Sequence, residues 1–124
     1  MLNAIRHSLF AIRHSLIARL LIGWIFAHIS FALPVKRLRE TETLIAFHHP
    51  KPSYPEHILL VPKKAIGNIS DLTPADNAFL ADVFRTVPEL AAELGLNTSG
   101  YRLIVNAGAY QDVPQLHFHL VAGG

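Results

Sequence analysis

The feature that most constrains the fold is an alternation of polar and apolar residues over residues 115–121, QLHFHLV. Residues two positions apart in a β-strand face the same side of the sheet. The alternation therefore predicts a strand whose polar row holds Gln115, His117 and His119. The opposite row, which should face the core, holds Leu116, Phe118 and Leu120. Two neighbouring imidazoles on a strand are suited to binding a metal, to dividing the roles of nucleophile and acid, or to neither.

Composition allows one small domain with a hydrophobic core. The chain has 124 residues, of which 51% are hydrophobic and 16% are charged, and this length is typical of a single domain. It contains no cysteine, which excludes disulfides, thiolate zinc sites and cysteine nucleophiles. Residues 34–124 hold eight basic and nine acidic residues. This part has no basic stripe, so no nucleic-acid partner is expected, whereas a small anionic ligand stays compatible with its charge.

Residues 1–33 form a separate N-terminal segment by their pattern. They carry three arginines and no acidic residue, and the motif AIRHSLF at residues 4–10 returns nearly unchanged at 11–17 with apolar residues at helical spacing. The uncharged stretch at 20–33 has fourteen residues, short of the roughly 20 that span a membrane. Four interpretations stay open: a helix packed on the domain or at an oligomer interface, a membrane-surface or anchoring helix, a signal peptide, and a non-native extension. We expect a cytoplasmic protein, with membrane contact through residues 1–33 as the alternative.

Residues 34–124 are expected to form one α+β domain. Strands are predicted at residues 35–40, 42–47, 57–61, 101–106 and 115–121. Residues 48–55 cannot form a regular element, because three prolines fall within six residues there.

One main helix is predicted between the third and fourth strands. Thr73 and Asp76 have the spacing of a capping box at a helix start, and Gly95 is the expected stop. Pro88 inside this run predicts a kink or a split, because proline lacks the N–H that a helix interior needs.

Several segments, taken in order, resemble the histidine triad (HIT) superfamily and, within it, the histidine triad nucleotide-binding (Hint-like) branch. Residues 115–123, QLHFHLVAG, resemble the superfamily signature of three histidines alternating with apolar residues, with Gln115 in place of the first histidine. Further similar segments lie at residues 33–36, 44–48, 55–64, 94–97 and 101–108. The resemblance covers about residues 33–124.

This resemblance implies a fold and a reaction. The fold is HIT-like, an antiparallel sheet of about five strands with a main helix, and two copies are expected to join their sheets side by side as a homodimer. The reaction is attack on the α-phosphorus of a nucleotide derivative through a nucleotidyl-histidine intermediate, without a metal or another cofactor. The implied substrates are nucleoside phosphoramidates, nucleotidyl esters or mixed anhydrides, and dinucleoside polyphosphates.

Carried over by position, the resemblance makes His117 the nucleophile and His119 the partner of a phosphate or leaving-group oxygen. Imidazole suits the first role because its ordinary pKa of about 6.5 leaves it neutral near pH 7. His57 and His48 are expected to support the site, and Asn106 to lie beside the phosphate or the sugar. For His57 and Asn106 a purely structural role stays open. The other expected substrate-binding residues are Phe47, His49, Gln111, Asp112 and Gln115.

Three positions depart from the family pattern. Gln115 cannot take up a proton at neutral pH, and His49 stands where the family places the aspartate that holds the ribose hydroxyls. Asp112 replaces a small hydroxyl residue, and its carboxylate would repel a phosphate unless it is turned away. These departures motivate the main alternative, a nucleotide-binding regulatory module with weak or lost catalysis. A metal site on the same imidazoles and a membrane-tethered interaction protein are the remaining alternatives.

Overall fold

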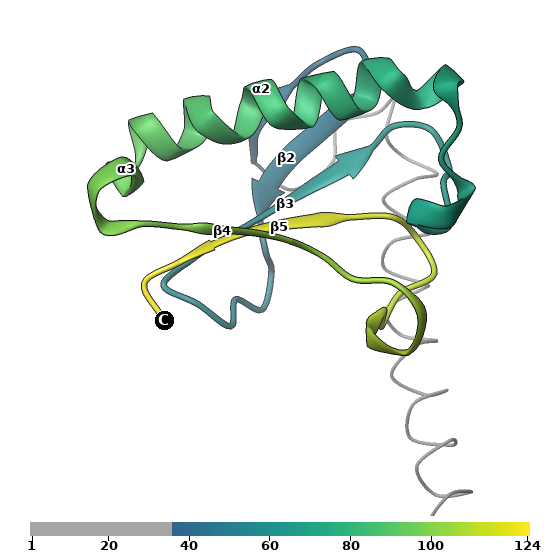
Figure 1. The fold of residues 1–124 in the computed structure, drawn as a ribbon. Coiled ribbons are helices and arrows are strands. Elements are labelled where there is room, and N and C mark those ends of the chain that lie inside the picture. The colour runs from purple at the N-terminus through teal and green to yellow at the C-terminus, as the bar shows by residue number, and fades with distance from the viewer. Residues whose placement is uncertain (1–35) are drawn as a thin grey trace, which may run out of the picture.

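The structure, a computed structural model, describes residues 36–124, and the interpretations of residues 1–33 lie outside the described residues. The fold is α+β: five antiparallel strands in the order β1-β2-β3-β5-β4, with the long helix α2 across one face of the sheet (Figure 1). The strands are β1 (Arg37–Glu40), β2 (Leu44–His48), β3 (Glu56–Pro62), β4 (Arg102–Val105) and β5 (Phe118–Ala122). The helices are α2 (Asn77–Glu93) and α3 (Leu96–Ser99), with 3-10 turns η1 (Ile69–Asp71), η2 (Pro74–Asp76) and η3 (Gly108–Tyr110). Within this part of the chain, no helix combines the length and the apolar character that a membrane crossing requires.

Strand β5 lies between β3 and β4 and pairs with both of them. It begins at Phe118, so the expectation of a regular strand from Gln115 onward is wrong. The reason lies in the neighbouring strand, because β3 ends at Pro62, which has no N–H to continue the ladder. The N–H of Leu116 instead donates to the carbonyl of Ile66 at 2.7 Å. Residues 115–117 thus reach the sheet as an anchored segment that precedes the strand.

The apolar row of the alternation faces the core, as predicted. Leu116, Phe118 and Leu120 are buried and pack with α2 residues such as Val83 and Leu90. Burial of this kind contributes about 25 cal/mol per Å² of apolar surface removed from water. The core between α2 and the sheet therefore holds β5 in place, and with it the polar residues on its other face.

Helix α2 starts where the sequence predicts and runs without the predicted break. Thr73 and Asp76 form a capping box around η2, which leads directly into α2. Gly95, at φ 70°, adopts the left-handed conformation that ends the helix. The split expected at Pro88 is wrong, since α2 is a single helix through this position. Pro88 and Phe84 are both exposed, so the Phe84 carbonyl that loses its partner lies on the solvent side.

Asp82 ties the turn between β1 and β2 to α2. Its carboxylate accepts hydrogen bonds from the hydroxyls of Thr41 and Thr43 and pairs with Arg85 one turn further along the helix. The hydrogen bond from Thr43, followed by that from Thr41, holds the pKa of Asp82 below its ordinary value. This polar contact fastens one end of the sheet to the helix.

Candidate active site

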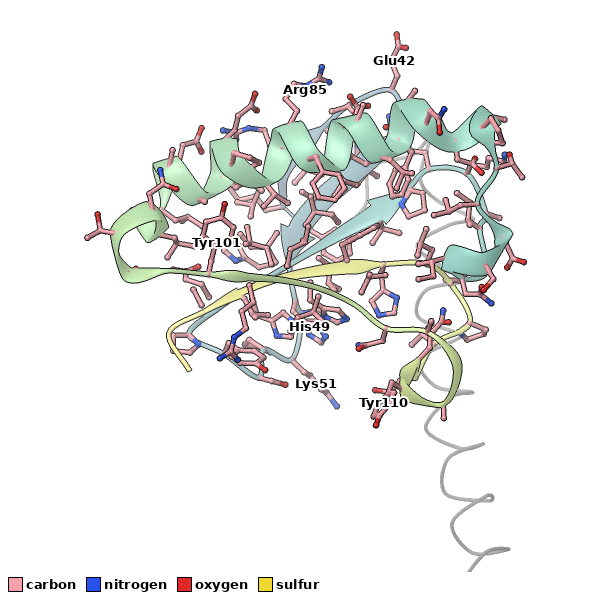
Figure 2. All side chains as sticks on the ribbon, in the orientation of Figure 1. Glu42, His49, Lys51, Arg85, Tyr101 and Tyr110 are labelled. Carbon is pink, nitrogen blue, oxygen red and sulfur yellow. The ribbon has the colours of Figure 1, made fainter. Side chains whose placement is uncertain are left out.

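Four imidazoles gather on the face of the sheet that α2 leaves uncovered. His57 comes from β3, His119 from β5, His117 from the segment just before β5, and His49 from the loop after β2. The ring centroids of His117 and His119 lie 4.7 Å apart, those of His57 and His119 5.1 Å, and those of His49 and His57 4.4 Å. Figure 2 shows His49 on the side of the sheet opposite α2. The rings form one contiguous cluster.

The hydrogen bonding of His117 leaves one of its nitrogens free to react. Its Nδ1 lies 2.7 Å from the backbone carbonyl of Gln115. A carbonyl can only accept a hydrogen bond, so Nδ1 carries the proton and donates. In neutral imidazole the other nitrogen, Nε2, then holds a lone pair. His117 is buried, and this lone pair is the nucleophilic atom that the arrangement can offer.

His57 and His119 form a hydrogen-bonded pair whose tautomers follow from the backbone. The N–H of Ser53 donates to Nδ1 of His57 at 3.1 Å, so the proton of neutral His57 sits on Nε2. This Nε2 lies 2.9 Å from Nδ1 of His119 and donates to it. The proton of neutral His119 therefore sits on its own Nε2. Beside the lone pair of His117, His119 thus offers an N–H donor.

The cluster favours neutral imidazoles. Burial, together with the nearby charges of His117, His57 and His49, lowers the pKa of His119 to about 3. Burial also lowers the pKa of His57. For His49, burial and then the charges of His57 and His117 lower the pKa. A second proton on His119 would also require Nδ1 to give up the hydrogen bond that it accepts from His57. Near pH 7 these three rings act as hydrogen-bonding groups without positive charge.

Gln111 positions the carbonyl on which the tautomer of His117 depends. Its side-chain Nε2 donates to the carbonyl of Gly67 at 2.7 Å and to that of Gln115 at 3.3 Å. The loop that follows β4 is thereby fastened to the segment after β3. Gln111 was expected to bind substrate, and in the structure its amide nitrogen has protein partners.

Gln115 presents an unusual amide. Its Oε1 atom is buried and has no hydrogen-bond partner among the described residues. Such an unsatisfied acceptor costs about 1–3 kcal/mol relative to a bonded one. The Nε2 atom of the same amide also makes no hydrogen bond within residues 36–124, and it is not sealed from solvent.

The structure brings only some of the other expected residues to the cluster. Continuing the β4–β5 register by one residue places Asn106 opposite His117. Phe47 lies in the cross-strand row of Leu59 and His119 and is buried. His48 is exposed at the end of β2 and alternates with Phe47, so it belongs to the other face of the sheet. Asp112 is exposed in the loop before β5, and it takes part in none of the ring contacts and hydrogen bonds described above for the four histidines.

Sequence reasoning missed the backbone groups that set the tautomers. The loop at residues 49–55, which has neither helix nor strand, brings the N–H of Ser53 to His57 and that of Lys51 to Nδ1 of His49 at 2.9 Å. It also brings the Tyr54 ring edge to face with the His57 ring, with 5.5 Å between the ring centroids. The three prolines in this loop were the available signal, since they restrict its backbone.

Metal ligation would need side chains in a different arrangement. Within the described part of the chain, no group of three or more histidine, cysteine, aspartate or glutamate side chains has the geometry to hold a metal ion. In the cluster, hydrogen bonds engage Nδ1 of His117, Nδ1 of His119 and both nitrogens of His57.

The fold and the site together define an α+β protein in which β5 and the segment just before it bring together two imidazoles, one with a lone pair available on Nε2 and the other with an N–H donor. The family model for the HIT domain matches residues 31–124, and the chain belongs to this family. An uncharacterized 13.2 kDa HIT-like protein from Azospirillum brasilense is 43% identical over 94 residues, covering 73% of this chain and 77% of that one.

Solved structures agree with this assignment. A HIT family hydrolase from Clostridium thermocellum superposes with a TM-score of 0.73 at 34% identity, covering 81% of this chain and 89% of that one. A histidine triad nucleotide-binding protein from Candida albicans superposes with a TM-score of 0.67 at 27% identity, covering 77% of this chain and 71% of that one.

Proposed function

We propose that this chain is a nucleotidyl hydrolase or transferase that attacks the α-phosphorus of a nucleotide derivative with Nε2 of His117. The observation that carries the proposal is the 2.7 Å hydrogen bond from Nδ1 of His117 to the carbonyl of Gln115. It leaves the lone pair of Nε2 available beside a neighbouring imidazole donor. Hydrolase is also the description of the Clostridium thermocellum relative.

The reaction proceeds in two displacements. The Nε2 lone pair of His117 forms a bond to phosphorus, and the bond from phosphorus to the leaving group breaks with its electron pair on the leaving atom. Water, or another acceptor, then attacks phosphorus, and the N–P bond breaks to restore His117. Two smaller barriers replace one large one. Water as acceptor gives a nucleoside monophosphate, and a different acceptor gives a transfer product.

His119 stabilises charge in both displacements. Its Nε2–H is aimed by the bond from His57 and would donate to a phosphate oxygen or to the departing atom. A fixed donor at the site of developing charge is among the larger contributions to catalysis. Asn106, opposite His117 in the β4–β5 register, would contact the phosphate or the sugar.

The substrates we propose are nucleoside phosphoramidates, nucleotidyl esters or anhydrides, and dinucleoside polyphosphates, as in the Hint-like branch. The Candida albicans relative is described as nucleotide-binding, which supports a nucleotide-derived ligand. His49, next to His57 in the cluster, would hydrogen-bond a ribose hydroxyl, with Phe47 nearby. We also propose a homodimer, because β4 is an edge strand of the sheet and an edge offers unpaired backbone groups to a second copy.

The alternative is a nucleotide-binding module with weak or lost catalysis. The observation that favours it is Gln115, which stands beside the nucleophile with an unpartnered buried oxygen and cannot supply a proton. In that case nucleotide would bind and no covalent adduct would form.

Rapid mixing with an adenosine phosphoramidate that carries a fluorescent leaving group, followed by acid quench and intact-protein mass spectrometry, tests the proposal. Wild type should release a burst of fluorophore and gain the mass of one nucleoside monophosphate. His117→Ala should do neither, whereas the control His48→Ala, which removes an exposed imidazole from the other face, should behave as wild type. Turnover that persists in His117→Ala would refute the assigned nucleophile, and bound nucleotide without any adduct in wild type would favour the module.

A further inference from the structure

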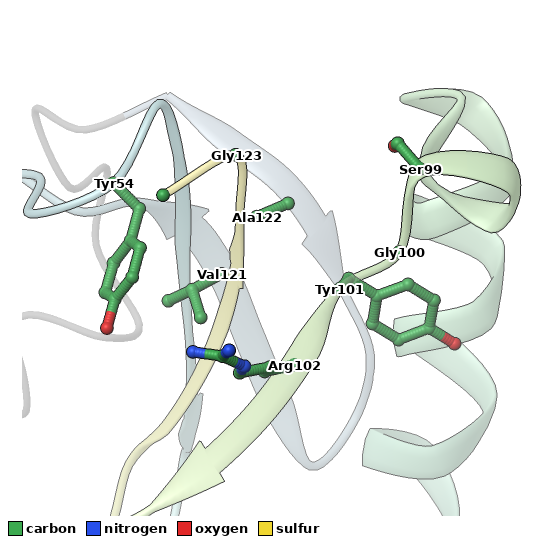
Figure 3. Close-up of a pocket in the computed structure, with 9 residues that line it drawn as sticks. Tyr54, Ser99, Gly100, Tyr101, Arg102, Val121, Ala122 and Gly123 are labelled. Atoms are coloured by element: carbon green, nitrogen blue, oxygen red, sulfur yellow. The ribbon is translucent and has the colours of Figure 1, made fainter.

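A hollow of about 460 Å³ lies at the end of β5. Figure 3 shows Tyr54 and Arg102 on either side of Val121, with the guanidinium of Arg102 directed toward the side of Tyr54. Tyr101, Gly123 and Gly124 also line the hollow. A volume of this size accommodates a small organic group or a phosphate chain.

A shared sheet face and a ring contact relate this hollow to the imidazole cluster. Val121 follows His119 by two residues on β5 and so shares its face, and the Tyr54 ring contacts the His57 ring at 5.5 Å. Arg102 is the register partner of Val121 on β4, which makes it the diagonal neighbour of His119. Diagonal neighbours lie about 7–8 Å apart, within reach of a long side chain.

The guanidinium of Arg102 is uncommitted within residues 36–124. Arg37, Arg39, Lys63, Lys64 and Arg85 all pair with acidic side chains. Arg102 makes no hydrogen bond or ion pair with any described residue and is exposed. Its five N–H donors are suited to a carboxylate or a phosphate, which it can bind with two parallel hydrogen bonds.

The direction of the proposed reaction leads to this hollow. In-line displacement puts the leaving group on the side of phosphorus opposite the attacking atom. The attacking atom belongs to His117, and the donor expected to meet the departing atom belongs to His119, two residues further along the same face. The leaving group is therefore displaced along β5 toward Val121.

Resting on the proposed function, we infer that this hollow is the subsite for a negatively charged leaving group, carboxylate or phosphate in character, which Arg102 binds. The bond from phosphorus to oxygen breaks with its electron pair on the departing oxygen. That oxygen leaves as an anion and takes no proton from the protein.

The hydrogen-bond network of the cluster agrees with a leaving group that needs no proton. His119 has one proton, on Nε2, and Nδ1 already accepts from His57, so loss of that proton would leave an unfavourable imidazolate. Gln115, two residues before His117, carries an amide that cannot donate a proton as an acid. Among the proposed substrates, those that release a carboxylate or a phosphate are therefore better matched to this network than phosphoramidates, because these anions leave without a proton whereas an amine leaves best when protonated.

Two adenosine 5′-monophosphate aryl esters test the subsite, one with 4-hydroxybenzoate and the other with 4-hydroxybenzamide as leaving group. The two are nearly equal in size and differ in distal charge. Wild type should have a kcat/KM about tenfold higher for the carboxylate ester, the effect of one charge-assisted contact. In Arg102→Gln this ratio should fall to near one, and Arg102→Lys should restore part of it.

Lys36→Gln is the matched control, because it removes one positive charge just before β1, at the other edge of the sheet from β4, and should keep the wild-type ratio. The same esters are compared for binding to His117→Ala, which cannot turn them over, and to His117→Ala combined with Arg102→Gln. A ratio near one in wild type, or a ratio unchanged by Arg102→Gln, would overturn the subsite. If turnover and the His117 adduct are intact, such a result leaves the proposed function standing. If wild type forms no adduct, the proposed function is refuted. In that case the ratio of the two binding affinities still decides whether the subsite exists.

A second pair of substrates shows whether the subsite serves a carboxylate or a phosphate leaving group. An adenylate mixed anhydride with acetate releases a carboxylate, and diadenosine triphosphate releases a nucleoside diphosphate. The substrate class that loses more kcat/KM in Arg102→Gln is the one the subsite serves, and equal small losses for both would count against it. Light scattering should give wild-type mass for Arg102→Gln, since a changed oligomeric state would assign Arg102 to an interface between copies instead.

Discussion

Nε2 of His57 lies 2.9 Å from Nδ1 of His119, and this single hydrogen bond determines which nitrogen His119 presents to a ligand. The bond is itself determined by the backbone N–H of Ser53, which occupies the other nitrogen of His57. A proline-containing loop thus sets the donor of the site through two imidazoles. His119 consequently acts as a fixed hydrogen-bond donor over the whole range in which an ordinary histidine titrates.

Stability should fall as pH drops from about 6.5 toward 3. An imidazole in the unfolded chain binds a proton near pH 6.5, whereas His119 in the fold does so only near pH 3. Between these values the unfolded state holds more protons, so the free energy of unfolding decreases by at most about 1.4 kcal/mol per pH unit for this group. Urea denaturation at pH 7.5, 6 and 5 measures the slope. His119→Gln should flatten it and His48→Gln should not; equal slopes in all three proteins would contradict the prediction.

Replacing Gln111 should slow formation of the adduct. Gln111→Leu removes the donor that holds the Gln115 carbonyl, so the Nε2 atom of His117 is less well aimed. The loss of one such hydrogen bond should lower kcat by about three- to tenfold, with KM little changed. Gln111→Glu, similar in size and without the amide donor, should resemble Gln111→Leu. Rapid quench isolates the adduct step, and an unchanged rate for that step would remove Gln111 from the positioning of His117.

Substituting Gln115 by methionine should stabilise the fold and slow the reaction. Methionine has nearly the same length and removes the unpartnered buried oxygen, so the free energy of unfolding should rise by about 1 kcal/mol. Turnover should fall if the amide of Gln115 contacts the ligand through its Nε2. Chemical denaturation and kcat/KM on the same preparation give both quantities. A less stable Gln115→Met protein would mean that the oxygen has a partner in solution.

The contact of Asp82 with the turn between β1 and β2 should contribute measurably to stability. Asp82→Asn removes the charge that accepts hydrogen bonds from Thr41 and Thr43 and should cost about 1–2 kcal/mol. Glu89→Gln, on the exposed side of the same helix, is the matched control and should change stability by less than about 0.5 kcal/mol. Denaturation curves at pH 7 distinguish the two, and similar values for both variants would show that the Asp82 contact is weak in solution.

Local patterns were sufficient for much of the architecture. The alternation around Phe118 predicted the apolar row that faces α2, and the spacing of Thr73 and Asp76 predicted the helix start. Both depend on residues a few positions apart, where side-chain direction follows from backbone geometry. The resemblance to the HIT superfamily predicted the five-stranded sheet, and the fold and the family model confirm it.

The remaining features depend on contacts between distant residues. Strand β5 starts at Phe118 because β3 ends at Pro62, and no pattern within residues 115–121 contains that information. The pair of His57 and His119 joins residues 62 positions apart. Pro88 interrupts no helix because its side of α2 faces solvent, which only the packed structure reveals.

The position of β5 in the sheet has a consequence for how the domain is made. It is the fifth strand along the chain and yet lies between β3 and β4, so a growing polypeptide carries two open strand edges until this segment has emerged from the ribosome. The pairing of β3 with β5 joins distant parts of the chain and is of the kind that forms slowly, whereas β4 and β5 are consecutive strands. Nascent chains that stop short of β5 should therefore bind chaperones readily, and the imidazole cluster is assembled in the same step that completes the sheet.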